Sequence, residues 1–356
     1  MKRIVIKIGS NVLTRSDGSI NLTRISSIVD QVAAVKKAGY QVILVSSGAV
    51  ACGRGFLGKK NNLDTVQQRQ LFSAVGQVRL ISLYSKFFHE YGIPIGQILT
   101  MKESFSTRRD YLNQRSCMEV MLNNNVVPIV NENDTISVTE LMFTDNDELS
   151  GLVASMMDAD TLLILSNVDG IYNGSPKDLK SGIIRKVMPD DDISPFISAE
   201  KSGFGRGGML TKSAIARKIA DEGIRVIIAN GCKANIIEDI IDNIDNVVCT
   251  EFVPRTEGIS SVKKWIAHST DFTKGSVRID DNAEKVLLGK SAASLLLVGV
   301  TEIQGYFEEG DVIGIFNSRG RKIALGRSSY SASEAQKMIG SHDRRPLVHY
   351  DYLYLV

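Results

Sequence analysis

The chain has 356 residues, of which 43% are hydrophobic and 23% carry a charge. This composition is ordinary for a globular protein, and the length exceeds what one hydrophobic core usually supports, so we expect two domains. A net charge of +2 excludes strong bulk attraction to nucleic acid or to an anionic membrane.

The sequence carries no targeting or membrane signal. The N-terminal stretch MKRIVIKIGS starts basic and then apolar, but Lys7 interrupts the apolar run too early for a signal peptide. A membrane helix needs about 18 continuous apolar residues, and no run of that kind occurs. The four cysteines lie far apart without a C-x-x-C pair, which favours isolated reduced thiols over a metal site. We therefore expect a cytoplasmic protein with no membrane segment and no structural metal.

Short β-branched runs alternate with longer amphipathic stretches along most of the chain. Helical spacing of apolar residues predicts helices over 22–39 and 147–159. Several of the β-branched runs are apolar throughout, as expected for parallel strands that are covered on both faces. The predicted strands are 3–8, 41–46, 94–100, 126–131, 161–166 and 225–230. This alternation predicts an α/β domain with a mostly parallel sheet, whose ligands bind beyond the carboxyl ends of the strands.

The pattern changes after about residue 250. Residues 275–356 contain short strands with glycines between them and little helical periodicity, for example SLLLVGV and GDVIGIF. A polar, turn-prone stretch at 267–275 precedes them. We therefore expect a separate, small β-rich domain at the C-terminal end.

Two strands end in residues that suit an anionic ligand. Lys7 lies near the end of a strand whose neighbours are isoleucine and valine, and the sequence GSN follows it. A phosphate or a substrate carboxylate would compensate its charge, although an edge lysine that reaches solvent remains an alternative. The strand 41–46 ends in SSGAVACGRG, where Ser47 precedes small residues that open a helix at Gly48–Ala49.

Acids and amides concentrate between residues 129 and 151. Asp145 and Glu148 resemble a helix capping box, which explains both of them structurally. Capping does not explain Asp134, Asn146 and Asp147. A carboxylate can bind the ammonium of a zwitterionic substrate, and an amide can donate to its carboxylate.

The stretch GFGRGGMLTK at 203–212 matches G-x-G-x-x-G but is not a P-loop, because Met209 follows Gly208. It is no dinucleotide fingerprint either, because no strand precedes it and the next strand ends in 229–230 without an acid. A glycine loop before a helix with Lys212 in its first turn suits a phosphate clamp. A flexible hinge would explain the glycines but not Lys212.

These segments together resemble the amino acid kinase family. The matching segments, in family order, are KIGSNVLT (7–14), SSGAVACGRG (46–55), VGQVRL (75–80), VPIVNENDTIS (127–137), DNDELSGLVA (145–154), DGIY (169–172) and GRGGMLTK (205–212). The resemblance implies a three-layer sandwich around a mostly parallel sheet over residues 1–260. Residues 275–356 look like a PUA domain, which many of these kinases carry.

The resemblance also implies an activity. It is transfer of the γ-phosphoryl group of ATP to the side-chain carboxylate of L-glutamate, the first step of proline synthesis. That carboxylate has a pKa of ~4.3 and is ionised at neutral pH, so no general base is required. Mg²⁺ would bridge the phosphates, without an assigned protein ligand. Proline is expected as a competing feedback inhibitor, and the protein as a homo-oligomer.

The resemblance assigns roles to individual residues. Lys7 and Lys212 would neutralise phosphate oxygens, with Asp147 orienting both lysines. The glutamate site would consist of Ser47, Asp134 and Asn146. The ATP site would consist of Lys7, Ser166, Asn167, Arg206, Gly207, Gly208, Met209, Leu210, Thr211 and Lys212. Family members usually have an aspartate where this chain has Asn167, and an amide there can donate a hydrogen bond but carries no charge.

Two alternatives stay open. A sibling kinase could act on aspartate, acetylglutamate or a nucleoside monophosphate, although the NEND segment disfavours these substrates. The PUA-like stretch could bind RNA as an added activity. Residues 275–356 hold ten basic and ten acidic residues, which gives a weak electrostatic footprint, but Arg319, Arg321 and Lys322 form a local basic cluster.

Overall fold

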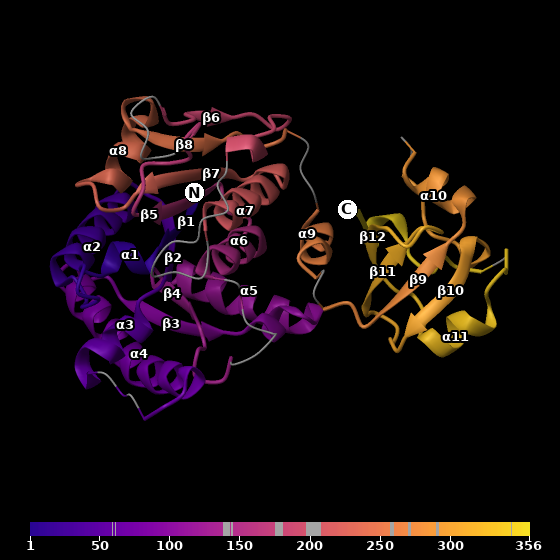
Figure 1. Ribbon diagram of the computed structural model, residues 1–356, viewed down its shortest axis with the longest axis horizontal. Helices are drawn as coiled ribbons and strands as arrows, with labels where there is room; N and C mark the ends of the chain where they lie inside the picture. Colours follow the sequence, from indigo (N-terminus) through magenta and orange to yellow (C-terminus); the bar gives the residue numbers. More distant parts are fainter. Residues whose placement is uncertain are drawn as a thin grey trace. The chain divides into compact units, whose positions relative to one another are not determined.

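The predicted strands assemble into one large sheet in the computed structural model (Figure 1). The structure describes residues 1–58, 60, 62–137, 143, 145–174, 181–196, 208–256, 260–269, 272–289, 292–342 and 344–356. Within these residues the sheet has eight strands in the order β3-β4-β2-β1-β5-β7-β8-β6. The strands are β1 (Arg3–Ile8), β2 (Gln41–Ser46), β3 (Ile95–Thr100), β4 (Val127–Glu132), β5 (Thr161–Ser166), β6 (Lys186–Val187), β7 (Arg225–Asn230) and β8 (Cys249–Phe252).

All neighbouring strands of this sheet run parallel except β7 and β8, which pair antiparallel. The six predicted strands are confirmed, with β3 and β4 each beginning one residue later than expected. The short strands β6 and β8 had no clear signal in the sequence. The strand order places the carboxyl ends of β1, β2, β4 and β5 next to one another.

Helices connect the strands of the large sheet. They are α1 (Ser10–Leu13), α2 (Leu22–Lys37), α3 (Ala49–Leu57), α4 (Thr65–His89), α5 (Arg108–Asn123), α6 (Asn146–Met156), α7 (Met209–Asp221) and α8 (Ile236–Asn243), with 3-10 turns η1 (Lys102–Phe105), η2 (Ser194–Phe196) and η3 (Ile244–Asn246). The predicted helices over 22–39 and 147–159 correspond to α2 and α6. Both are thereby confirmed.

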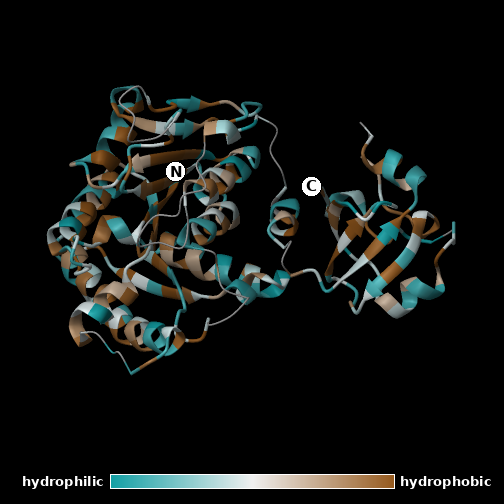
Figure 2. Ribbon diagram, viewed as in Figure 1, coloured by the Kyte–Doolittle hydropathy of each residue, from teal (hydrophilic) through white to brown (hydrophobic). Residues whose placement is uncertain are grey.

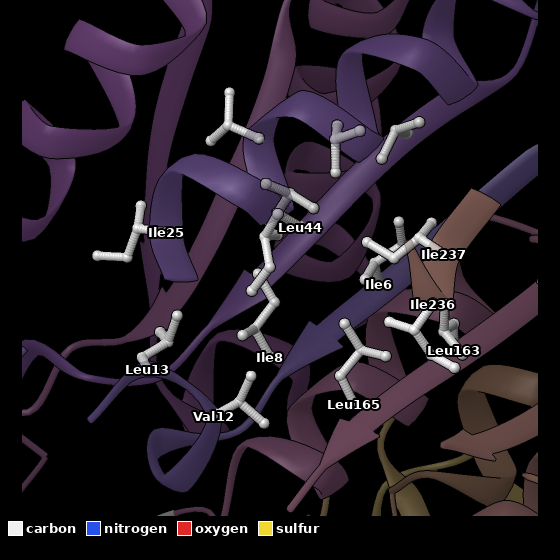
Figure 3. Close-up of a cluster of buried hydrophobic side chains, with 14 of the residues drawn as sticks. Ile6, Ile8, Val12, Leu13, Ile25, Leu44, Leu163, Leu165, Ile236 and Ile237 are labelled. Carbon is white, nitrogen blue, oxygen red and sulfur yellow. The ribbon is translucent and has the colours of Figure 1, made fainter. Parts of the chain in front are cut away.

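The two faces of the sheet are covered by different helices, which confirms the three-layer architecture. On one face, Ile6 and Ile8 of β1 pack with Ile25 of α2 and Ile237 of α8 (Figure 3). On the other face, α6 packs against β1 and β5, and α7 packs against β7 and α6. Successive side chains of a strand point to opposite faces, so Lys7 lies on the face that α6 covers. Figure 2 shows that hydrophobic residues dominate the central strands, as burial on both faces requires.

Helices α3 and α4 pack at very close range. A Cβ atom on Gly53 would lie 1.9 Å from the carbonyl oxygen of Phe72, and one on Gly76 would lie 1.8 Å from that of Ala49. No side chain can occupy such a space, so both positions require glycine. This contact fixes the position of α4, whose side chains reach the candidate site described below.

The C-terminal part of the chain forms a second, β-rich unit, as predicted. Within the described residues its sheet has five strands in the order β10-β9-β11-β12-β13, and only β9 and β11 pair parallel. Phe307, Ile313 and Val348 lie in its fully buried core. Its elements are α9 (Ser261–Ala267), β9 (Gly275–Ile279), α10 (Asp281–Leu287), η5 (Leu297–Gly299), β10 (Val300–Gly305), β11 (Val312–Phe316), β12 (Lys322–Arg327), α11 (Ala332–Lys337), η6 (Tyr350–Tyr352) and β13 (Leu353–Leu355).

This second unit also takes in a segment from the middle of the chain. Contacts divide the protein into Met1–Lys102 with Leu112–Gly258, and Glu103–Tyr111 with Ile259–Val356. The indole N–H of Trp265 donates to the carbonyl oxygen of Phe105 at 3.2 Å. Arg108 of the same middle segment stacks over the Trp265 ring, 5.7 Å from its centroid, so this segment contacts α9 at two points.

No helix in the described part of the chain combines the length and the apolar character that crossing a membrane demands. Two of the cysteines, Cys52 and Cys249, are buried, as expected for small hydrophobic side chains. Cys117 and Cys232 are exposed, which their isolated positions in the sequence did not indicate.

Candidate active site

The structure brings Lys7, Asp147 and Lys212 together. Lys7 lies near the end of β1, Asp147 in the first turn of α6, and Lys212 in the first turn of α7. The ammonium of Lys7 forms an ion pair with Oδ1 of Asp147, and that of Lys212 lies 2.9 Å from Oδ2. The Asp147 side chain is fully buried, while 6% of the Lys7 side chain and 12% of the Lys212 side chain are exposed. One buried carboxylate therefore holds two ammonium groups side by side.

The charges of this group decide the protonation of Asp147. Burial alone would raise the pKa of the Asp147 carboxyl, but Lys7 and Lys212 outweigh burial and lower it to about 2. The carboxylate is thus ionised at neutral pH. The two ammonium groups are the part of this group that suits a polyanionic ligand such as a phosphate chain.

Asp145 caps the helix that carries Asp147. Its Oδ1 accepts the backbone N–H of Asp147 at 2.8 Å and that of Glu148 at 3.2 Å, which confirms the predicted N-cap. Glu148 does not reach back to complete a capping box, because its carboxylate pairs with Lys102 at 3.1 Å. The Oδ2 of Asp145 is buried and has no hydrogen-bond partner among the described residues. Burial and the charge of Asp147 raise the pKa of Asp145 to about 6.

Replacing Asp145 with asparagine should stabilise the protein above pH 6. The folded-state pKa lies above the ordinary value of 3.8, so ionisation of Asp145 destabilises the fold as the pH rises through about 6. The difference between these pKa values corresponds to ~3 kcal/mol, and asparagine Oδ1 can accept the same backbone N–H groups. We expect Asp145→Asn to melt higher than the wild type at pH 8 and at the same temperature below pH ~4. Equal melting temperatures at pH 8 would contradict this expectation.

A chain of amide hydrogen bonds lies at the ends of β2 and β4. The side-chain N–H₂ of Asn146 donates to the hydroxyl of Ser47 and to Oδ1 of Asn131, each at 2.9 Å. Asn131 in turn donates to Oε1 of Gln77 on α4 at 2.9 Å. The structure thus brings together Ser47 and Asn146, two of the residues expected to bind the substrate. Gln77 extends the chain to α4.

Asp134 lies in a different cluster, with two charged neighbours. The guanidinium of Arg69 on α4 forms an ion pair with Asp134 and another with Oε2 of Glu132, at 3.2 Å. The other oxygen of Glu132 accepts from the Ser137 hydroxyl at 2.8 Å and from the backbone N–H of Phe143 at 3.1 Å. Burial raises the pKa of Glu132, and these hydrogen bonds and Arg69 oppose the rise. Asp134 itself is 14% exposed.

The carboxyl ends of β5 and β7 form the other side of the site. Ser166 is buried, and its carbonyl oxygen accepts the backbone N–H of Gly231 at 2.8 Å, while Asn167 is exposed. Asp169 lies two residues further on, and its Oδ1 is 2.7 Å from the Lys233 ammonium. Asp169 of this ion pair therefore lies two residues after Asn167, the position at which family members usually have an aspartate.

The N-terminus of α7 supplies the end of the glycine loop. Gly208 is the N-cap of α7 in an extended conformation, and among the described residues no side chain caps this helix, so its first backbone N–H groups are candidates to bind an anion. Leu210 is exposed, and Met209 and Thr211 are half-buried. The predicted residues Arg206 and Gly207 lie outside the described residues.

Arg69 and Gln77 are the residues of this site that the sequence reasoning missed. Both lie on α4, away from the strand ends at which ligand-binding residues are expected. The one signal for Gln77 was its place in VGQVRL, a segment shared with the family. The helix pattern alone gives no signal for Arg69, because a basic residue on a long helix is usually a solvated surface residue.

The family is decided by comparison with known sequences. A sequence model of the amino acid kinase family matches residues 2–230. The chain belongs to the amino acid kinase family. A model of the PUA domain matches residues 275–349 in the second unit, which confirms the expected PUA domain.

Curated relatives match along nearly the full chain. The chain is 57% identical to the glutamate 5-kinase of Bacteroides thetaiotaomicron, over 99% of this chain and 98% of that protein. It is 43% identical to the glutamate 5-kinase of Chlorobaculum tepidum, over 100% and 98%. Among solved structures, a UMP kinase from Ureaplasma parvum covers 71% of this chain and 98% of its own, with 17% identity and a TM-score of 0.51. This last likeness extends to the fold alone.

Proposed function

We propose that this member of the amino acid kinase family is a glutamate 5-kinase, which phosphorylates the side-chain carboxylate of L-glutamate with ATP in the first step of proline biosynthesis. Full-length identity of 57% to a protein of that name supports the substrate. The observation that carries the chemistry is the pair of ammonium groups from Lys7 and Lys212 on the buried Asp147.

The reaction needs alignment and positive charge more than acid–base catalysis. A side-chain oxygen of glutamate attacks the γ-phosphorus, a new O–P bond forms, and the bond from that phosphorus to the β-phosphate oxygen breaks to release ADP. The glutamate carboxylate has a pKa of ~4.3 and is already ionised. Negative charge spreads over the transferring phosphoryl oxygens, and fixed cations beside it lower the barrier. Lys7 and Lys212 supply these cations, and Asp147 keeps both in place.

Glutamate would bind at the ends of β2 and β4. Asp134 carries the negative charge that the substrate ammonium requires. The Ser47 hydroxyl accepts from Asn146 and can donate to the substrate carboxylate, with Asn146 holding it in place. These roles place the substrate on the side of Asp147 that faces β4. A substrate analogue without the α-ammonium group would lose the contact to Asp134.

ATP would bind between β5 and α7. Ser166, Asn167 and the N-terminus of α7 from Gly208 to Thr211 line this side, and the glycine-loop residues Arg206 and Gly207 are proposed to join them. Within the described residues, no cluster of three or more acids, histidines or cysteines could hold a metal by itself. Mg²⁺ therefore fits as an ion that enters with ATP, bound mainly by phosphate oxygens and water. When bound, it neutralises phosphate charge.

The direct test is ADP release with L-glutamate, L-aspartate and N-acetylglutamate compared at equal concentrations. We expect turnover with L-glutamate and at least a hundredfold lower kcat/KM with the other two acids. A preference for L-aspartate or N-acetylglutamate would assign the chain to a sibling kinase instead.

Replacing Asp134 with asparagine should raise the KM for glutamate and leave ATP binding nearly intact. Loss of a charge-assisted hydrogen bond costs about 1.5–3 kcal/mol, or roughly ten- to a hundredfold in KM. Steady-state kinetics with each substrate varied in turn measures this. An equal fall in ATP affinity would show that Asp134 is assigned to the wrong ligand.

Several properties follow from the same proposal. Proline shares an ammonium and a carboxylate with glutamate, so it would inhibit by competing at the Asp134 side of the site. We further infer a homo-oligomer in the cytoplasm, where ATP is supplied, with a kinase domain over 1–260 and a PUA domain over 275–356. RNA binding by the PUA domain stays a secondary candidate, supported by its matched family and by Arg319, Arg321 and Lys322.

A further inference from the structure

We propose that Arg69 is a positioning residue for the amino acid substrate, which holds the Asp134 carboxylate in the orientation that receives the substrate ammonium. This inference rests on the proposed function of the Asp134 side of the site. It concerns an arginine on α4, far in sequence from the residues that bind the phosphates.

The orientation of the Asp134 carboxylate depends on a contact with Arg69. Asp134 lies in the turn after β4, and in the part of the chain that the structure describes, the guanidinium of Arg69 is the one hydrogen-bond donor to its carboxylate. The contact is made through Oδ1. An aspartate side chain in a turn rotates freely unless a donor fixes it, and a bond to one oxygen directs the other oxygen away from the guanidinium.

Glu132 does not depend on Arg69 in the same way. Its Oε1 already accepts from the Ser137 hydroxyl and the backbone N–H of Phe143, so two donors hold it without the arginine.

The charges of this cluster support the same role for Arg69. Glu132 and Asp134 are two acids two residues apart, and Arg69 balances one of them. Among the described contacts of these three side chains, two carboxylates share one guanidinium, an arrangement that favours a further cation such as an ammonium group.

Arg69 lies on a helix that is itself held firmly in place. Its helix is pinned against α3 by the glycine contact of Gly53 and Gly76 described above. From the same helix, the side-chain amide of Gln70 donates to the carbonyl oxygen of Thr135 at 2.9 Å, beside Asp134. Arg69 thus acts from a rigid element, as a residue that positions another side chain must. A buried ion pair often adds little net stability to a fold, so a gain in stability alone does not explain why Arg69 pairs with Glu132 and Asp134.

The test compares Arg69→Met with Asp134→Asn and with the double variant. We expect Arg69→Met to raise the KM for glutamate about tenfold or more, with kcat and the KM for ATP changed by no more than about twofold. Because Arg69 acts through Asp134, adding Arg69→Met to Asp134→Asn should raise the KM by less than about twofold more. Arg69→Lys, which keeps the charge but cannot bridge two carboxylates, should lie between the wild type and Arg69→Met.

Arg79→Met is the matched control, because Arg79 lies on the same helix and its guanidinium stacks on the Phe56 ring. It should leave the KM for glutamate unchanged. Additive effects of Arg69→Met and Asp134→Asn would overturn the proposal, since they would mean that Arg69 acts without Asp134. An unchanged KM, or an equal loss of ATP affinity, would also overturn it. A wild type that releases no ADP with glutamate would instead overturn the proposed function, and this role with it.

Discussion

Replacing Lys212 with alanine should lower kcat by about two to three orders of magnitude, while the KM for glutamate should change by less than about threefold. Removing one fixed donor that faces the developing charge of a transition state typically costs ~3–4 kcal/mol. The Lys212 ammonium stands beside that of Lys7 on the same carboxylate, and the proposed mechanism puts both where phosphate charge redistributes. Its loss therefore affects the chemical step far more than the binding of an amino acid. Steady-state kinetics at saturating ATP measures the change.

Lys218→Ala is the matched control for this result. Lys218 lies in the last turn of α7, on the helix that carries Lys212. Its removal should change kcat by no more than about twofold. If Lys212→Ala kept wild-type kcat with an unchanged melting temperature, Lys212 would have no part in phosphoryl transfer.

Replacing Asp147 with asparagine should cost the protein about 3–5 kcal/mol of unfolding free energy at pH 7. Breaking a buried ion pair by removing one partner leaves an uncompensated charge in the interior, and here two ammonium groups lose their common carboxylate. The kcat should fall as well, because Lys7 and Lys212 would repel each other without the carboxylate between them. Denaturant unfolding of both proteins measures the stability difference.

The effect of Asp147→Asn should depend on pH. Because the folded-state pKa of Asp147 is lowered to about 2, its carboxylate stabilises the fold above the ordinary value of 3.8, and this contribution disappears as the pH falls through about 2. The stability difference between wild type and variant should therefore shrink between pH ~4 and pH ~2. Asp169→Asn is the control, because Asp169 and Lys233 are 28% and 40% exposed and such pairs contribute at most ~1 kcal/mol. A pH-independent difference for Asp147→Asn would contradict the assignment.

The fold and one part of the candidate site were predictable from local patterns. Six strands showed up as β-branched runs, and Lys7, Asp147 and Lys212 each lie within one turn of a strand end or helix start. Parallel strands end at the same edge, so residues at their ends meet whatever their distance in sequence. This rule accounts for Lys7 and Asp147. It does not account for Lys212, because α7 follows β6, and β6 runs opposite to β7.

The missed features depend on long-range packing instead. Arg69 reaches Asp134 from the second turn of the long helix α4, and its role depends on how α4 lies against α3. Periodicity shows which face of a helix is apolar but not which charged side chain meets a turn 65 residues away. The packing of Glu103–Tyr111 with the C-terminal residues has the same cause, because contacts such as those of Trp265 with Phe105 and Arg108 leave no periodic signal.

The two-segment make-up of the second unit limits how it could be exchanged between proteins. A module that evolution can shuffle usually comes from one uninterrupted stretch of gene, with both ends at one junction. Here a transplant that begins at Ile259 would leave Phe105 and Tyr111 behind, and both are about 1% exposed in this structure. The recipient would receive Trp265 without its hydrogen-bond acceptor, and the donor would keep Phe105 and Arg108 without the indole that both contact. Chimeras of this protein should therefore carry Glu103–Tyr111 and Ile259–Val356 from the same parent.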